Sequence, residues 1–233
     1  MNSNKILLLM ALLMCWSVTA SAAFVLNTTR VVVSEKDKYV SFEVSNQGTE
    51  EYGGQVWIEN PVIPGSDGAF VAIPAFFRVG PGEKQIVRIV NASRGLDGSK
   101  EHLYWLNVQE IPPKPKNKNV IQLAVRSKIK LFYRPLNLRD GRKDVESEIF
   151  IGNTNAGYIL RNDSPYFLSI VAIKDPDGNK IQLSNNVANM LATFRPFEEV
   201  IIGNSIPKNA NTLTVFSMND YGGVSKYDIE IKR

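Results

Sequence analysis

The sequence contains very little of the chemistry on which enzymes and metal sites most often depend. It has one cysteine, Cys15, and one histidine, His102. A cysteine-based zinc site and a histidine-rich metal site would need more of these residues than the chain has. A thiol nucleophile could only be Cys15. The motifs GxSxG, GxxxxGK(S/T) and HExxH are also missing. We expect neither catalysis nor a metal or cofactor, and His102 is the only residue on which an enzyme hypothesis could be built.

Long apolar runs are missing as well. The one extended run, from Ile6 to Val18, is shorter than the roughly 20 residues that a membrane-spanning helix needs. Lys5 precedes this run and the small residues Ala20-Ser21-Ala22 follow it, which is the pattern of a secretory signal peptide. We therefore expect residues 1–22 to be removed before Ala23, and the mature chain to be exported without membrane insertion. Because Cys15 lies in this leader, the mature chain cannot form a disulfide and must bury a sufficient core.

Charge of one sign is not in large excess. The chain has 27 basic and 23 acidic residues, and its formal net charge is +4. This excess is too small to indicate a nucleic-acid-binding protein. We expect no nucleic-acid partner.

Short segments with alternating apolar and polar residues, bounded by turn residues, make up most of the chain. No long segment with the 3.6-residue period of a helix competes with them, so the sequence predicts an all-β fold. The expected strands are Val40–Ser45, Gln55–Glu59, Gln85–Val90, Leu103–Val108, Asn119–Pro135, Tyr158–Leu160, Phe167–Ile173, Lys180–Leu183, Val200–Ile202, Thr212–Met218 and Tyr227–Ile231.

The polar, turn-prone segment Leu136–Asp144 divides these strands into two series. We place a domain boundary there, with an N-terminal domain of residues 23–141 and a C-terminal domain of residues 142–233. Roughly seven short strands in each domain are typical of immunoglobulin-like β-sandwiches, here without the usual disulfide.

The segment Asn119–Pro135, NVIQLAVRSKIKLFYRP, has an apolar side and a cationic side. Its apolar residues Ile121, Leu123, Val125, Ile129 and Leu131 alternate with the basic residues Arg126, Lys128, Lys130 and Arg134. An ordinary half-buried strand shows the same pattern. Periodicity alone therefore favours a core strand whose charges face solvent.

Several motifs in the same order along both halves resemble one family. They are AFVLNTTRVVV at the start of the mature chain, WIEN, FFRVGPGEKQIVRIV, LYWLNVQEIPP, NVIQLAVRSKIKLFYRP, NDSPYF and NDYGG. Together they resemble the periplasmic chaperones of chaperone–usher pili, the PapD-like family. The resemblance implies two immunoglobulin-like domains in an L-shaped or boomerang arrangement. It also implies a periplasmic chaperone that binds, folds and caps pilus or fimbrial subunits and delivers them to an outer-membrane usher.

The resemblance further implies donor-strand complementation, in which the chaperone lends a strand to an incomplete subunit sandwich. Ile121, Leu123 and Val125 would be the apolar side chains inserted into the subunit. Arg30 and Lys130 match the two basic residues that bind the C-terminal carboxylate of the subunit in this family.

Glu101, Arg134 and Asp220 match a charged cluster that the family places between its domains. The resemblance departs from the family at Glu50–Gly54, where many relatives carry a proline that helps to block the usher-binding surface. The control of usher binding is therefore not carried over from the family.

Two other hypotheses remain open at the level of the sequence. The chain could be an exported immunoglobulin-like adhesion or ligand-binding module in which Tyr104, Trp105 and Tyr221 line a surface, or a periplasmic enzyme that uses His102. Since a bare apolar strand edge promotes aggregation, the free protein could also cap itself as a homodimer.

Overall fold

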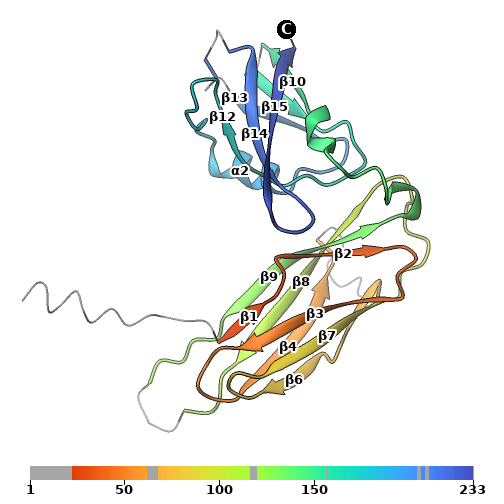
Figure 1. Ribbon diagram of the computed structural model, residues 1–233, viewed down its shortest axis with the longest axis vertical. Helices are drawn as coiled ribbons and strands as arrows, with labels where there is room; N and C mark the ends of the chain where they lie inside the picture. Colours follow the sequence, from red (N-terminus) through yellow and green to blue (C-terminus); the bar gives the residue numbers. More distant parts are fainter. Residues whose placement is uncertain are drawn as a thin grey trace, which may run out of the picture.

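The computed structural model describes residues 23–61, 68–115, 120–155, 157–203, 206–207 and 210–232. The signal peptide expected at residues 1–22 lies outside the described residues. The described chain forms two β domains that follow one another along the long axis and meet at an angle (Figure 1). The prediction of an all-β protein with two immunoglobulin-like domains is confirmed.

The N-terminal domain is a sandwich of two sheets. Its strands are β1 (Phe24–Leu26), β2 (Arg30–Ser34), β3 (Tyr39–Asn46), β4 (Tyr52–Glu59), β5 (Phe70–Ile73), β6 (Phe76–Val79), β7 (Lys84–Asn91), β8 (His102–Ile111) and β9 (Arg126–Arg134). One sheet has the order β1-β3-β7-β5 and the other the order β2-β9-β8-β4-β6.

Alternation in the sequence accounts for the core between these sheets. In β3, Phe42 and Val44 are buried, whereas Ser41 is exposed and Glu43 half-buried. Successive side chains of a strand point to opposite faces, so each such strand presents one apolar face to the core. The same cluster includes Val33, Val87 and Leu131, which come from three other strands.

The C-terminal domain closes around a second core. Its strands are β10 (Phe150–Thr154), β11 (Gly157–Arg161), β12 (Ile170–Lys174), β13 (Glu199–Gly203), β14 (Thr212–Met218) and β15 (Val224–Lys232). They form one curled sheet in the order β12-β14-β15-β10-β11-β13, because β15 pairs with both β14 and β10. The 3-10 helices η1 (Leu136–Leu138) and η2 (Val145–Glu148) lie between β9 and β10.

One expected strand of the C-terminal domain is wrong, and one helix was not predicted. Lys180–Leu183 makes only an isolated bridge between Lys180 and Lys174 and is not a strand. The chain then forms the helix α2 (Asn185–Ala192), whose first turn is capped by Ser184 accepting a hydrogen bond from the Val187 N–H. A serine cap at the start of a short helix is a local signal that the search for alternating residues passed over.

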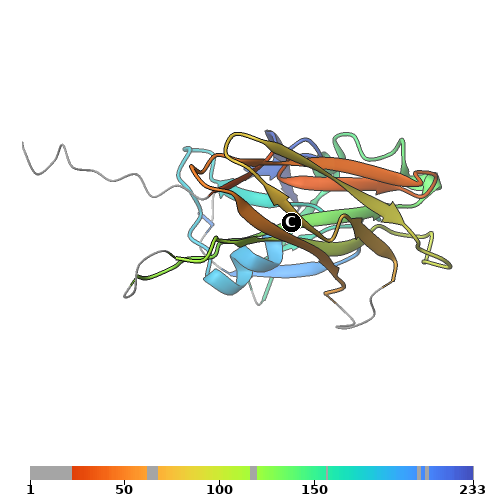
Figure 2. The same cartoon turned by 90° about the horizontal axis from the view of Figure 1, so that it is seen from below.

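The segment Asn119–Pro135 is not one continuous strand. β9 begins only at Arg126, and residues 120–125 have no strand partner. In both views, this stretch of the chain extends away from the body of the N-terminal domain (Figures 1 and 2). The prediction of a core strand is therefore correct for Leu131 and wrong for the residues before Arg126.

Candidate functional site

The described residues before β9 present an apolar row that the domain does not bury. Ile121 is 92% exposed, Leu123 is 77% exposed and Val125 is 41% exposed. The row is fixed at its end, because the carbonyl of Val125 accepts hydrogen bonds from the Glu110 N–H and the Gln109 side chain. Three large apolar side chains held outside the core provide a surface for another molecule.

The backbone that follows this row is an open strand edge. β8 pairs with residues 126–133 of β9, whereas β2 pairs in parallel only with Lys130–Arg134. In the described part of the chain, residues 126–129 therefore have a neighbouring strand on one side only. Unpaired N–H and C=O groups on such an edge can bind an added strand.

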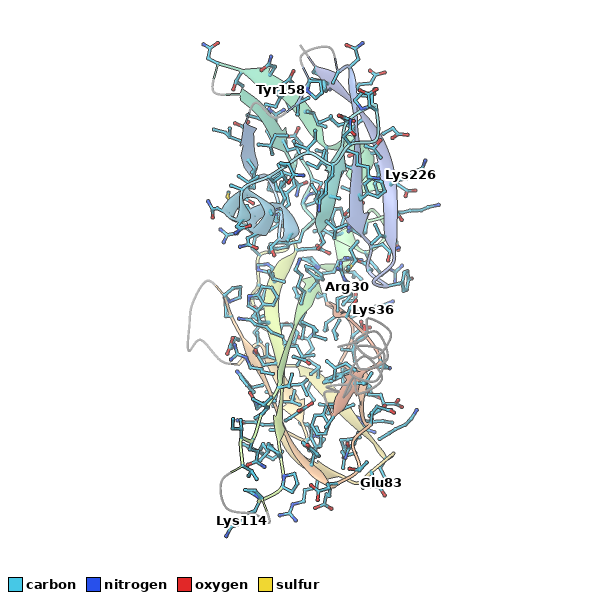
Figure 3. The ribbon with its side chains drawn as sticks, turned by 90° about the vertical axis from the view of Figure 1, so that its left-hand side faces the viewer. Arg30, Lys36, Glu83, Lys114, Tyr158 and Lys226 are labelled. Atoms are coloured by element: carbon cyan, nitrogen blue, oxygen red, sulfur yellow. The ribbon has the colours of Figure 1, made fainter. Side chains whose placement is uncertain are left out.

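Arg30 and Lys130 lie side by side where this open edge ends. They are directly opposite each other in the parallel register of β2 and β9. Arg30 Nη1 donates to the Met218 carbonyl at 3.0 Å, and Lys130 Nζ donates to Ser169 Oγ at 2.9 Å and to the Ala192 carbonyl. Both cations thus reach from the N-terminal to the C-terminal domain, and Arg30 lies at the junction of the two (Figure 3).

The charges of this pair are poorly compensated. Burial, together with a smaller repulsion from Arg30, lowers the pKa of Lys130 to about 8. Burial also lowers the pKa of Arg30, and the charge of Asp220 offsets only part of that effect. The buried Nε of Arg30 has no hydrogen-bond partner among the described residues. Two close cations whose partners are mainly neutral oxygens form a site suited to an anion.

The second predicted cluster lies beside this pair, and its arginine is paired with two carboxylates. Burial raises the pKa of Glu101 and the charge of Arg134 offsets only part of that effect, so the compensation is more complete for the arginine than for Glu101. Arg134 Nε donates to Glu101 Oε1 at 2.5 Å, and its two terminal nitrogens donate to the Asp220 carboxylate at 2.8 and 3.1 Å. The other Glu101 oxygen accepts from the Phe167 N–H at 2.9 Å. Burial opposes the charge of Arg134, but hydrogen bonds and charges of Asp220 and Glu101 outweigh it and raise the pKa above its ordinary value. The structure brings all three predicted residues together across the domain junction.

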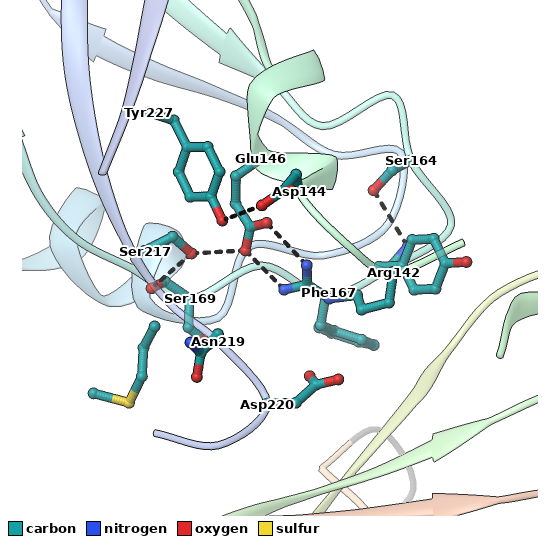
Figure 4. Close-up of polar contacts among 12 residues, drawn as sticks. Arg142, Asp144, Glu146, Ser164, Phe167, Ser169, Ser217, Asn219, Asp220 and Tyr227 are labelled. Carbon is teal, nitrogen blue, oxygen red and sulfur yellow. Dashed lines mark hydrogen bonds and ion pairs between the residues drawn. The ribbon is translucent and has the colours of Figure 1, made fainter. Parts of the chain in front are cut away.

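A third ionic group was not predicted from the sequence. Arg142 donates two hydrogen bonds to the buried carboxylate of Glu146 at 2.9 and 2.7 Å, and Ser217 Oγ donates to the same carboxylate at 3.0 Å (Figure 4). The only hint of this ion pair in the sequence is the four-residue spacing of the arginine and the glutamate. The arginine lies near the end of the polar segment that we interpreted only as a domain boundary.

The residues of the alternative hypotheses do not form a common site. Tyr104 is buried against Phe70, with ring centroids 4.9 Å apart, and Trp105 points to the other face of β8. Tyr221 is 96% exposed in the turn between β14 and β15. His102 Nε2 lies 2.7 Å from the Asp97 carbonyl oxygen.

Among the described residues, no group of three or more histidine, cysteine, aspartate and glutamate side chains is placed to hold a metal ion. No helix in this part of the chain combines the length and the apolar character required to span a bilayer.

Two segments that together cover most of the described chain match models of one protein family. Residues 23–139 match the family described as pili and flagellar-assembly chaperone, PapD N-terminal domain. Residues 144–229 match the family described as pili assembly chaperone PapD, C-terminal domain.

Individual relatives agree with these matches. The chain is similar to chaperone protein FanE of Escherichia coli, at 38% identity over 97% of this chain and 98% of that protein. It is similar to chaperone protein PapD of Escherichia coli, at 30% identity over 88% of this chain and 84% of that protein. The crystal structure of the CupB2 chaperone of Pseudomonas aeruginosa superposes with a TM-score of 0.75 at 25% identity, covering 89% of this chain and 100% of that one. The chain belongs to the PapD-like family of pilus-assembly chaperones.

Proposed function

We propose that this protein is a periplasmic, non-catalytic chaperone that caps pilus subunits by donor-strand complementation and passes them to an outer-membrane usher. The observation that carries the proposal is the continuity of three features along the chain. An exposed apolar row at residues 121–125 leads into an open strand edge at residues 126–129, and this edge ends at the cation pair of Arg30 and Lys130.

The apolar row supplies the side chains that an incomplete sandwich lacks. Ile121, Leu123 and Val125 occupy every second position, so in an extended backbone they point to the same side. Complete burial of each is worth roughly 1.5–3 kcal/mol, which gives a gross gain of several kcal/mol before ordering costs. A gain of this size can support a complex that shields the subunit from aggregation and can still be transferred.

The position of the cation pair determines the direction of the subunit strand. The C-terminal carboxylate of the subunit binds at Lys130, and the open edge lies entirely on the N-terminal side of that residue. The preceding residues of the subunit must then lie beside residues 121–129, so its last strand runs parallel to β9. Anchoring the carboxylate fixes the register, and a slip by one residue would invert every side chain.

The test is co-expression of the protein with a subunit of its own pilus. We expect a soluble one-to-one complex that Arg30→Ala and Lys130→Ala each abolish, because a carboxylate held by two cations makes charge-assisted hydrogen bonds that a methyl group cannot replace. Complex formation is measured by co-purification and by the mass of the complex in solution.

Lys84→Ala is the matched control. Lys84 is an exposed lysine on the other sheet, where it pairs with Glu43 at 2.9 Å, and its removal should leave the complex intact. Retained binding by both Arg30→Ala and Lys130→Ala, with the fold verified by circular dichroism, would overturn the proposal.

The same open edge favours self-capping when no subunit is present. Two copies that pair their exposed apolar rows would shield Ile121 and Leu123 from water. We therefore propose a reversible homodimer of the free protein. Replacing Ile121 and Leu123 with serine should convert it to a monomer in analytical ultracentrifugation, whereas replacement of exposed Val171 in the C-terminal domain should not.

A further inference from the structure

The face of β9 opposite the apolar row carries a series of cations that extends the carboxylate site along the open edge. Arg126, Lys128 and Lys130 occupy every second position of β9 and lie on one side of the strand. Lys130 belongs to the cation pair described above. The other two belong to the part of β9 along which the subunit strand would pair.

Both cations lie over tryptophan rings on the side of β9 away from the open edge: Trp105 is on the adjacent strand β8, and Trp57 is on β4, the strand beyond β8. The Arg126 guanidinium lies over the Trp57 ring, 5.8 Å from its centroid, and Lys128 Nζ lies 4.9 Å from the centroid of Trp105. Such contacts restrict the side chains without neutralising their charge. The cations are therefore held on this face of the sheet.

The two cations differ in their counter-charge. Lys128 Nζ lies 3.5 Å from a carboxylate oxygen of Glu59, and Trp57 Nε1 donates to the same carboxylate at 2.8 Å. Arg126 has no carboxylate partner among the described residues. Because no ion pair with a described residue holds it over Trp57, the Arg126 side chain can turn from that ring toward the open edge and pair with an acidic group of a bound partner.

We propose that Arg126 makes the chaperone selective for subunits whose last strand carries an acidic side chain on its outward face, upstream of the C-terminal carboxylate. This inference rests on the proposed function, because it requires the subunit strand to lie parallel to β9 with its carboxylate at Lys130. Side chains on the same face of adjacent strands are close enough to form ion pairs.

The geometry also gives the position of the acidic residue. Arg126 precedes Lys130 by four residues, which is about 13 Å along an extended chain. The acidic side chain therefore lies about four residues before the end of the subunit. Side chains alternate in direction, so the residues directly before and after that position point into the core of the subunit and gain nothing from Arg126.

The experiment uses synthetic peptides long enough to cover residues 121–129, with alternating valine and threonine and a free C-terminal carboxylate. One series moves a single glutamate through the last positions, and a second series moves a lysine. Affinity for the full chain is measured by fluorescence anisotropy at low and at high salt.

Arg126→Glu is compared with Arg88→Glu as a matched control. Arg88 is an arginine on the other sheet whose guanidinium lies over an aromatic ring at nearly the same distance, 5.7 Å from the Tyr39 centroid. The two substitutions change the net charge equally, and thermal unfolding verifies that both variants are folded.

We expect the wild type to prefer the glutamate peptide over the lysine peptide by about two- to fivefold at low salt, only at alternate positions. Arg126→Glu should reverse this preference, Arg88→Glu should preserve it, and high salt should suppress it. A preference that is absent, or that Arg126→Glu and Arg88→Glu change equally, overturns the inference. Lys130→Ala is measured in parallel: if it leaves binding of every peptide unchanged, the proposed function itself fails.

Discussion

Two groups of cations meet at the junction of the domains, and they differ in what surrounds them. Arg134 is enclosed by the carboxylates of Glu101 and Asp220, and its pKa is raised. Arg30 and Lys130 have mainly neutral partners, and the pKa of each is lowered. Both groups bridge the same two domains. The difference is therefore a difference of charge compensation.

This contrast separates a group that holds the structure together from a group that is available for binding. A buried charge with a full set of partners has no remaining capacity for a ligand. A buried charge without a counter-ion destabilises the free protein and gains stability when an anion binds. We infer that Glu101, Arg134 and Asp220 fix the angle between the domains. Arg30 and Lys130 remain available to bind the carboxylate of the subunit.

The largest expected effect comes from breaking the compensated group. Glu101→Ala removes the carboxylate that accepts the 2.5 Å hydrogen bond from Arg134. The same carboxylate accepts a hydrogen bond from the Phe167 N–H, which is also lost. Removing one partner of a buried ion pair typically costs about 3–5 kcal/mol. We expect a loss of that size in the free energy of unfolding, measured in urea.

Glu43→Ala serves as the control for this change. Glu43 forms an exposed ion pair with Lys84, and the loss of such a pair costs at most about 1 kcal/mol. If Glu101→Ala lowers the free energy of unfolding by an equally small amount, the group of Glu101, Arg134 and Asp220 does not hold the structure together as we infer.

The sequence predicts the members of both groups but not their energetics. Alternation and the family motifs were sufficient for the two all-β domains, because each strand of the core repeats a simple apolar pattern. Charge compensation was not predictable, since Arg30 and Met218, or Lys130 and Ala192, come together only when the two domains dock. The ion pair of Arg142 and Glu146 was overlooked for a different reason: it lies within the C-terminal domain, but its further partner Ser217 comes from a strand far away in the sequence.

Residues 121–125 show what the alternation of apolar and polar residues cannot predict. Ile121–Val125 and Ile129–Leu131 carry the same alternating pattern, yet only the second stretch packs against the core of the domain. A pattern of apolar residues indicates that a face will be buried, and it does not tell whether the burying partner belongs to the same chain. The family resemblance supplied that information here.

The lowered pKa of Lys130 should make subunit binding depend on pH. With a pKa of about 8, Lys130 is charged below pH 8 in the free protein, and a bound carboxylate raises that pKa. Subunit affinity should then be constant between pH 6 and 7.5 and fall by up to about tenfold per pH unit above 8, because binding requires uptake of a proton.

Lys130→Arg isolates this effect, since a guanidinium keeps its proton throughout the range. The variant should bind with little dependence on pH in the same titration, performed with a subunit or a terminal peptide. A parallel decline in both proteins would place the titrating group elsewhere than at Lys130.

The smallest expected effect is a gain in the free energy of unfolding, whereas Glu101→Ala is expected to lower it. The pKa of Lys130 falls from 10.5 to about 8 on folding, which corresponds to about 3 kcal/mol of destabilisation below pH 8. Lys130→Met removes this cost but also loses the hydrogen bonds to Ser169 and Ala192, worth about 1 kcal/mol each. We expect a net gain of about 1 kcal/mol in the free energy of unfolding at pH 7, together with loss of subunit binding.

The pH dependence of stability gives an independent check on this sign. Because the folded-state pKa of Lys130 is the lower one, the unfolded chain holds more protons between pH 8 and 10.5, and the stability of the wild type rises with pH through that window. The methionine variant lacks this contribution, so the difference between the two proteins should disappear and then reverse as the pH increases. A Lys130→Met protein that is less stable than wild type at pH 7 would show that Lys130, like Arg134, contributes to holding the domains together.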